Sequence, residues 1–174
     1  MMGAMLTRAP VRALVKVPEL NGRFEAEPFA ASAAVNRGLA VAMRGGGLIS
    51  PAILDAQGMD LDAIMEAMRD MIARTHARTR TGRLRNSEIA QGTITMSRLG
   101  ETGVDALFGV IYPPQVALVG FGAPRLRPIV RDGRVEPRLG VTATLDADHR
   151  VSDGRRGALF LAEINRLLPE PKCL

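Results

Sequence analysis

The sequence holds little that could cross-link, chelate or stack. Its one cysteine, Cys173, excludes an intrachain disulfide and a CxxC metal or redox pair. Aromatic residues make up 3% of the chain, which excludes a stacking platform for single-stranded nucleic acid. No apolar run approaches the ~20 residues of a membrane-spanning helix, and residues 1–10 lack the features of a secretory signal. We therefore expect a cytoplasmic protein with no metal and no membrane contact.

The residues that are present fit one globular domain. The 174 residues fall within the ~100–200 of a typical domain, and 47% hydrophobic with 24% charged residues exclude wholesale disorder. The net charge of +5 is carried by arginines spread along the chain, without a basic motif or a reading helix. We expect no nucleic-acid partner. The arginine-rich stretch 74–85 is interpreted as a solvated helix end, with phosphate binding as the alternative.

Apolar periodicity and turn residues predict the order of elements. Helices are predicted over three segments: 5–17, starting near Pro10; 60–81, capped by Asp60 and ended by Gly82; and 152–168. Extended segments are predicted over 35–43, 48–54 with Pro51 at an edge or bulge, 92–97, 116–122 and 141–145. Asp132-Gly133 predicts a hairpin turn, and the apolar run 116–122 a buried central strand. This order is typical of an α/β sandwich with a mixed sheet.

His149 is the candidate catalytic base. It lies in the sequence DHRVSDG between the predicted strand 141–145 and the last helix, where reactive groups are often displayed. A neutral imidazole is the best general base available near pH 7. Asp153, four residues later, could orient the imidazole or its loop. On spacing alone, a plain helix-capping role for Asp153 or Ser152 is favoured.

Other site types have no support in the sequence. GxSxG, Walker and dinucleotide motifs are absent, and the glycines at 45–47 lead into extended sequence rather than a helix. His76 and His149 lie far apart and make a weak zinc site. A histidine base without its own nucleophile indicates an enzyme whose nucleophile arrives on the substrate.

Residues 148–154 (DHRVSDG) resemble the DHRxxDG signature of the dihydrolipoamide acyltransferases, the core subunits of 2-oxo acid dehydrogenase complexes. Further similar motifs follow in the family's order: VPELN at 17–21, VNRGLAVA at 35–42, GTITMSRLG at 92–100 and PPQ at 113–115. The resemblance covers nearly the whole chain.

The resemblance implies the two-layer α/β sandwich of coenzyme A-dependent acyltransferases, shared with chloramphenicol acetyltransferase. It implies acyl transfer between the thiol of coenzyme A, a substrate, and a dihydrolipoyl thiol supplied by another domain or chain. By the resemblance, His149 deprotonates the attacking thiol, Ser97 donates a hydrogen bond to the oxyanion and Asp153 supports the site. A homotrimer or larger core assembly is implied, with Ser97 and His149 coming from different subunits. A separate chain that supplies the family's missing N-terminal part is the further partner that the comparison with the family suggests.

The chain also departs from the family's pattern. Residues 1–174 are expected to be a single catalytic domain that lacks the family's segment before residues 5–17, its lipoyl domain and its peripheral-subunit-binding domain. Arg98 and Tyr112 stand where the family usually has Asn or a small polar residue. Two alternatives therefore stay open: a non-catalytic trimeric scaffold or assembly subunit, and a longer reading frame in which Met1 is a misassigned start.

Overall fold

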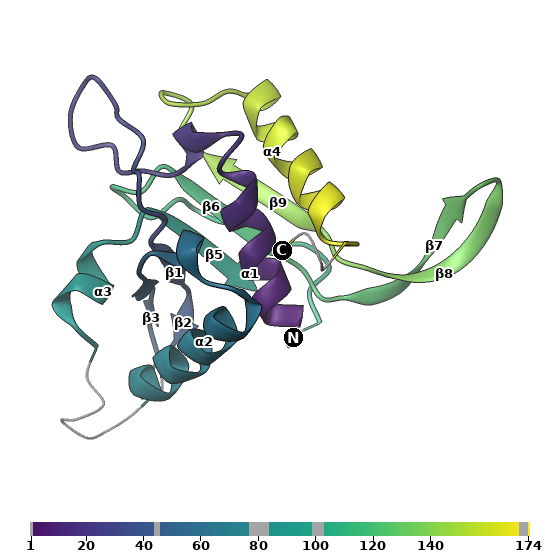
Figure 1. Cartoon of the computed structure of the whole chain (residues 1–174), viewed down its shortest axis with the longest axis horizontal. Coiled ribbons are helices and arrows are strands. Elements are labelled where there is room, and N and C mark those ends of the chain that lie inside the picture. The colour runs from purple at the N-terminus through teal and green to yellow at the C-terminus, as the bar shows by residue number, and fades with distance from the viewer. Residues whose placement is uncertain (1, 44–45, 77–83, 99–102, 171–173) are drawn as a thin grey trace.

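Five short strands form the central sheet of the computed structural model, which describes residues 2–43, 46–76, 84–98, 103–170 and 174 (Figure 1). The strand order is β4-β1-β5-β6-β9, and β1, β5 and β6 run parallel while β4 and β9 pair antiparallel at the edges. The mixed sheet predicted from the sequence is confirmed. The strands are β1 (Arg37–Leu39), β4 (Ala52–Ile53), β5 (Ile94–Arg98), β6 (Ala117–Phe121) and β9 (Ala143–Ala147).

Three helices cover one face of this sheet (Figure 1): α1 (Met2–Ala13), α2 (Leu61–His76) and α4 (Gly154–Leu167). The apolar core lies between these helices and the sheet, where Met96 and Phe121 pack in one cluster with Leu6 and Phe160. An ion-pair network joins α4 to the turn that follows α1, because the Glu163 carboxylate binds both Lys16 and Arg166 at 2.7 Å. None of the helices in the described residues is long and apolar enough to cross a membrane.

The smaller elements lie around this core. They are η1 (Pro18–Leu20), η2 (Ala56–Gly58), α3 (Asn86–Ala90), the hairpin of β2 (Val41–Ala42) with β3 (Leu48–Ile49), and the hairpin of β7 (Arg125–Arg131) with β8 (Arg134–Gly140). The β7–β8 hairpin turns at Asp132 and Gly133, whose φ values are 50° and 75°. A two-residue I′ hairpin turn requires such positive φ values, so the predicted turn is confirmed.

The other face of the sheet is crossed by residues 103–112, which run along β6. Gly120 lets this segment approach, because a Cβ there would lie 2.6 Å from the carbonyl oxygen of Leu107. Gly122 is packed even more closely, against the backbone of Asp105. Hydrogen bonds from Thr144 Oγ1 to the Leu107 carbonyl and from the Gly109 N–H to Asp146 hold the segment on the sheet.

Several predicted boundaries are wrong for physical reasons. The first helix spans 2–13 with Pro10 inside it, because most of its residues are buried and their packing outweighs the ~3 kcal/mol cost of an internal proline. The predicted strand 35–43 is divided into β1 and β2, and 48–54 into β3 and β4 around Pro51. The second helix is capped as predicted, since Asp60 accepts a hydrogen bond from the Ala63 N–H at 2.8 Å. Gly82 lies outside the described residues.

Candidate active site

His149 lies in a tight turn directly after β9. The Asp148 N–H donates to the Val116 carbonyl at 2.8 Å, and the N–H groups of Val151 and Ser152 donate back to the Asp148 carbonyl. The turn leaves the imidazole exposed to solvent. His149 lines a surface pocket of about 350 Å³ formed by the end of β9 and the first turns of α4, together with Ser152, Asp153, Gly154 and Gly157 among others.

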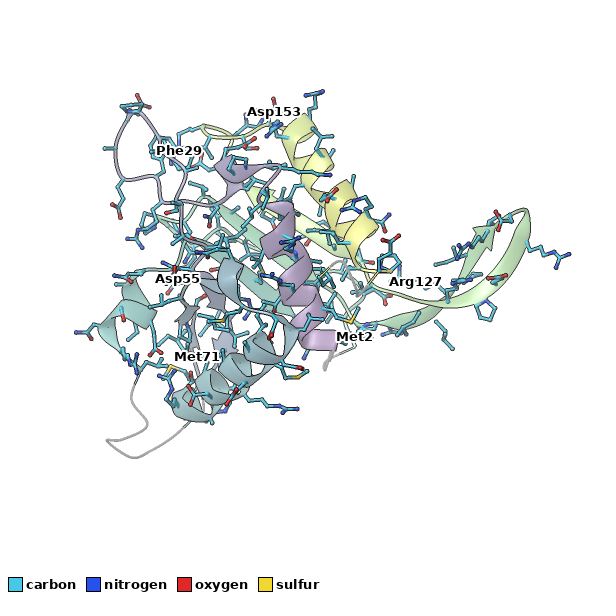
Figure 2. All side chains as sticks on the ribbon, viewed as in Figure 1. Met2, Phe29, Asp55, Met71, Arg127 and Asp153 are labelled. Carbon is cyan, nitrogen blue, oxygen red and sulfur yellow. The ribbon has the colours of Figure 1, made fainter. Side chains whose placement is uncertain are left out.

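Arg150 fixes this turn from the outside. Its guanidinium donates to both oxygens of Asp148, at 3.0 and 2.6 Å, and holds the pKa of that carboxyl below its ordinary value. The same guanidinium lies 3.9 Å from the centre of the Phe24 ring, which stacks on Phe29 at a centroid distance of 6.2 Å. Phe29 lies on the long loop between η1 and β1 (Figure 2). The backbone around His149 is therefore clamped by charge pairing and cation–π contact.

Asp153 is the N-cap of α4. Its Oδ1 accepts a hydrogen bond from the Arg156 N–H at 2.8 Å, as the capping alternative predicts. The Arg156 side chain in turn pairs with Glu19 and lowers the pKa of that carboxyl. Within the described residues no hydrogen bond joins Asp153 to the His149 ring. Asp153 therefore holds the start of α4, and it lines the same pocket as His149.

Ser97 lies on a different part of the sheet from His149. It is half-buried on β5 and pairs with Gly120 of β6, which pairs with Thr144 of β9. From Thr144 to the end of β9 at Ala147 the chain rises ~10 Å, and His149 lies beyond that end. One chain does not bring Ser97 and His149 together, so the subunit-shared site implied by the resemblance stays a prediction.

Sequence reasoning missed a buried polar network beside Ser97. Thr95 donates from Oγ1 to Gln115 Oε1 at 2.7 Å and lies 3.2 Å from the Ser50 hydroxyl. Thr93, at the next position on the same face, donates to Asn21 Oδ1 at 2.6 Å. The alternation of Thr93, Thr95 and Ser97 within residues 92–97 was the available signal, because alternate residues of a strand share a face.

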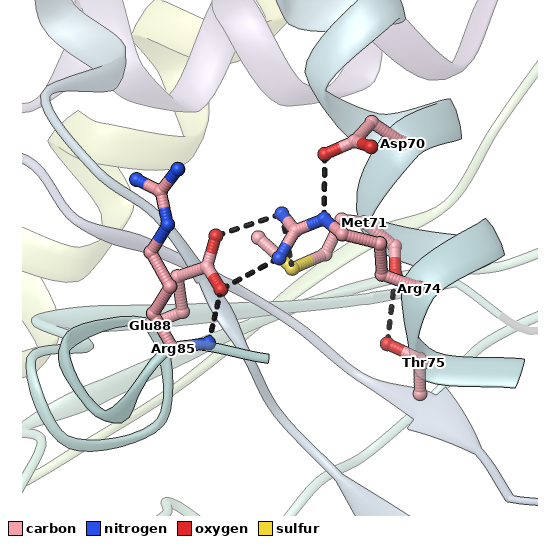
Figure 3. Close-up of polar contacts among 6 residues, drawn as sticks. All are labelled: Asp70, Met71, Arg74, Thr75, Arg85 and Glu88. Carbon is pink, nitrogen blue, oxygen red and sulfur yellow. Dashed lines mark hydrogen bonds and ion pairs between the residues drawn. The ribbon is translucent and has the colours of Figure 1, made fainter. Parts of the chain in front are cut away.

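The described part of the arginine-rich stretch is tied to carboxylates (Figure 3). Arg74 binds Asp70 at 2.7 Å and forms a two-point contact with Glu88 at 2.7 and 2.8 Å, which raises the pKa of Arg74 and lowers that of Glu88. The Arg85 N–H also donates to Glu88. Arg74 is therefore satisfied within the chain rather than presented to a phosphate; residues 77–83 lie outside the described part. Among the described residues no group of three or more His, Cys, Asp and Glu side chains could hold a metal ion.

The arrangement of sheet and helices is shared with acyltransferases of known structure. A probable dihydrolipoamide acetyltransferase from Listeria monocytogenes 4b F2365 matches at a TM-score of 0.89 and 26% identity, over 98% of this chain and 71% of that one. A chloramphenicol acetyltransferase matches at a TM-score of 0.62 and 18% identity, over 97% and 78%, which shows the fold alone. The fold is thus that of the chloramphenicol acetyltransferase class, as predicted.

The sequence fixes the family within that class. Residues 2–174 match the model for the 2-oxoacid dehydrogenases acyltransferase (catalytic domain), and the chain belongs to this family. The dihydrolipoyllysine-residue acetyltransferase component of the Zymomonas mobilis pyruvate dehydrogenase complex is 32% identical over 96% of this chain, which spans 37% of that protein's length. An uncharacterized Mycobacterium tuberculosis protein is 57% identical over 41% of this chain and 90% of its own length.

Proposed function

We propose that this chain transfers an acyl group between the thiol of coenzyme A and the thiol of a dihydrolipoyl group. The observation that carries the proposal is His149, an exposed imidazole in a pocket at the end of β9, held on a clamped turn in a chain of the acyltransferase family. The dihydrolipoyl group comes from another domain or chain, and the active form is a homotrimer or a larger core assembly.

The proposed reaction needs one base and one hydrogen-bond donor. The His149 imidazole takes the proton of the attacking thiol, whose ordinary pKa of ~8.5 makes this a modest transfer. The thiolate adds to the thioester carbonyl carbon, and the Ser97 hydroxyl of a second copy donates to the resulting oxyanion, a contact typically worth ~3–4 kcal/mol. The carbon–sulfur bond to the leaving group then breaks, and the imidazolium returns its proton to the leaving thiolate.

Asp153 has an indirect role in this proposal. By capping α4 it fixes the helix start that forms one wall of the His149 pocket. We therefore treat Asp153 as a positioning residue. Asp153→Asn keeps a capping oxygen and is expected to retain kcat, whereas Asp153→Ala removes the cap and lowers kcat together with stability.

The test is transfer of the acetyl group from acetyl-coenzyme A to dihydrolipoamide. His149→Ala is expected to lower kcat by ~10²–10⁴-fold, the usual contribution of a general base. His76→Ala is the matched control, because His76 lies on α2, does not line the His149 pocket and has its ring 3.1 Å from the Ala42 carbonyl. Equal activity of His149→Ala and wild type would refute the proposal. An assembled wild-type chain without turnover would instead support the scaffold alternative.

Complementation tests the sharing of the site between copies. Ser97→Ala and His149→Ala chains are each expected to be inactive alone. Refolded together in equal amounts, they are expected to regain about a quarter of wild-type activity. In a randomly mixed cyclic assembly, about half of the sites have an intact Ser97 and about half an intact His149, so about a quarter have both. No recovery from a mixed assembly would contradict a site made by two copies.

A further inference from the structure

Two aromatic rings lie beside the turn that carries His149, although they come from a loop near the start of the chain. The Phe24 and Phe29 rings stack with their centroids 6.2 Å apart and their planes within 11° of each other. The Phe29 ring in turn packs on Gly22, where a Cβ would lie only 2.7 Å from the ring. Neither phenylalanine belongs to the apolar core. The Phe24 ring is therefore held in place by its neighbours on the loop.

The backbone of this loop and the His149 turn are anchored on the same segment. The Phe24 N–H donates to the Pro114 carbonyl at 2.7 Å, and two residues later the Val116 carbonyl accepts the Asp148 N–H at 2.8 Å. Val116, which is fully buried, also donates from its N–H to the Gly22 carbonyl at 3.2 Å. The position of the Phe24 ring relative to the turn is thus set by main-chain hydrogen bonds.

Arg150 joins this ring to the turn. The central carbon of its guanidinium lies 3.9 Å from the centre of the Phe24 ring, and its Nε and Nη2 atoms donate to Asp148 at 3.0 and 2.6 Å. A planar guanidinium can stack on an aromatic ring while its N–H groups, which lie in the plane, bind a carboxylate. The Arg150 backbone N–H also donates to Asp148 Oδ1, at 3.0 Å. The Asp148 carboxylate therefore binds both the backbone and the side chain of Arg150, and it closes the turn around His149.

The ion pair alone would hold the turn weakly. The Arg150 side chain is 62% exposed, and ion pairs in contact with water contribute little to stability because water and salt screen them. A ring against the guanidinium excludes water there and restricts Arg150 to the orientation in which it binds Asp148. We propose that Phe24 is a positioning residue for His149 and that it acts through Arg150.

The chemistry of the site makes this positioning matter. The inference rests on the proposed function, in which the imidazole must lie within hydrogen-bond reach of the attacking thiol. A displacement of about 1 Å from the productive geometry can lower a rate ~10²-fold. Neither Phe24 nor Arg150 lines the His149 pocket. Changes at these two residues are therefore expected to lower kcat and to leave KM for coenzyme A and dihydrolipoamide unchanged.

The test is a double-mutant cycle on acetyl transfer. Phe24→Leu is expected to lower kcat by about 2–5-fold, which corresponds to the loss of one exposed cation–π contact. Arg150→Ala also removes the contacts with Asp148 and is expected to lower kcat by about 10–100-fold. Because Phe24 acts through Arg150, adding Phe24→Leu to Arg150→Ala is expected to change kcat no further. Equal effects of Phe24→Leu in both backgrounds, or a rise in KM that accounts for its effect, would overturn the inference.

Two variants of the same loop serve as controls. Phe24→Tyr keeps an aromatic face and is expected to keep the wild-type kcat. Glu25→Gln changes the next residue, which pairs with Arg23 at 2.7 Å, and is also expected to keep it. A loss of kcat in Glu25→Gln equal to that in Phe24→Leu would contradict a specific role of Phe24. Melting temperatures near that of the wild type are expected for these loop variants, and a kcat that falls only in step with the melting temperature would indicate a structural role instead.

A spectroscopic measurement separates this inference from the proposed function. The chain has two histidines, so the ring signals of His149 and His76 can be assigned by nuclear magnetic resonance with the help of His149→Ala. Phe24→Leu is expected to shift or broaden the His149 signals and to leave those of His76 unchanged. That result in a wild-type background without acyl transfer refutes the proposed function and leaves the positioning contact intact. Unchanged His149 signals in Phe24→Leu overturn the inference even where the wild type is active.

Discussion

The guanidinium of Arg37 is buried and pairs with no carboxylate among the described residues, and its replacement is expected to stabilise the protein. It opens β1 and is 4% exposed, and its Nε and Nη1 atoms have no hydrogen-bond partner in the described part of the chain. Burial, with a smaller contribution from the nearby positive charge of Arg98, lowers the pKa of Arg37 to about 9. A buried charge of this kind destabilises the fold.

The magnitude follows from the pKa. The fall from the ordinary arginine pKa to about 9 corresponds to about 5 kcal/mol at neutral pH. Arg37→Met replaces the guanidinium with an apolar chain that adapts to its surroundings, and replacements of buried charges typically recover ~1–4 kcal/mol. The unfolded state keeps this proton to a much higher pH, so in a window that opens near pH 9 it binds more protons than the folded state. Wild-type stability therefore rises across that window, and the advantage of the variant is full below pH 9 and shrinks above it.

Urea unfolding at pH 7 and pH 10.5 measures both effects. The protein concentration is held constant, because the proposed assembly would make apparent stability depend on it. The matched control is Arg8→Met, since Arg8 is also buried but donates to the carbonyls of Ala56 and Gln57 at 3.2 and 2.9 Å. Losing these bonds is expected to cost ~1–3 kcal/mol. An Arg37→Met variant no more stable than wild type at pH 7, or a difference unchanged at pH 10.5, would refute the reasoning.

Three further predictions concern the site, the helices and the sheet. Phe24→Leu removes the ring against Arg150 and is expected to lower kcat by about 2–5-fold with little change in melting temperature, because exposed cation–π contacts are worth ~0.5–1 kcal/mol. Arg166 and Lys16 lower the pKa of Glu163 to about 2. The stability that these two ion pairs supply is therefore present above about pH 4.5 and is lost as the pH falls toward 2. Thermal melts of Glu163→Gln are expected to lack that acid dependence. Gly122→Ala is expected to destabilise the protein by more than ~3 kcal/mol in urea unfolding, because its Cβ would collide with backbone. Gly154→Ala has open space at its Cβ, and a comparable loss there would contradict the steric explanation.

Local rules were enough for most of the fold. The run 116–122 predicts β6, which is buried at every position, and Asp132-Gly133 predicts the β7–β8 turn, because both signals depend on neighbouring residues alone. Long-range pairing is not encoded in this way. The antiparallel pairing of β9 with β6, which separates His149 from Ser97, could be anticipated only through the family resemblance.

Residues that depart from general rules could not be predicted from the sequence either. Arginine is rarely buried without a partner, so nothing in the sequence marks Arg37 as interior. The alternation of Leu126, Pro128 and Val130 with arginines was visible in the sequence. Such a pattern predicts a second layer packed on the apolar side of the hairpin, and the described part of the chain contains no such layer.

The close crossing of residues 103–112 over β6 determines how its exposed side chains, Phe108, Val110 and Tyr112, are held. Because Gly120 and Gly122 let the crossing segment lie directly on the sheet, its backbone is held by β6, a strand that is buried at every position. A surface fixed in this way is ordered before any encounter, so little conformational entropy is lost when it is covered. Gly120 and Gly122, although buried, thus reduce the entropy that is lost when these exposed side chains are covered.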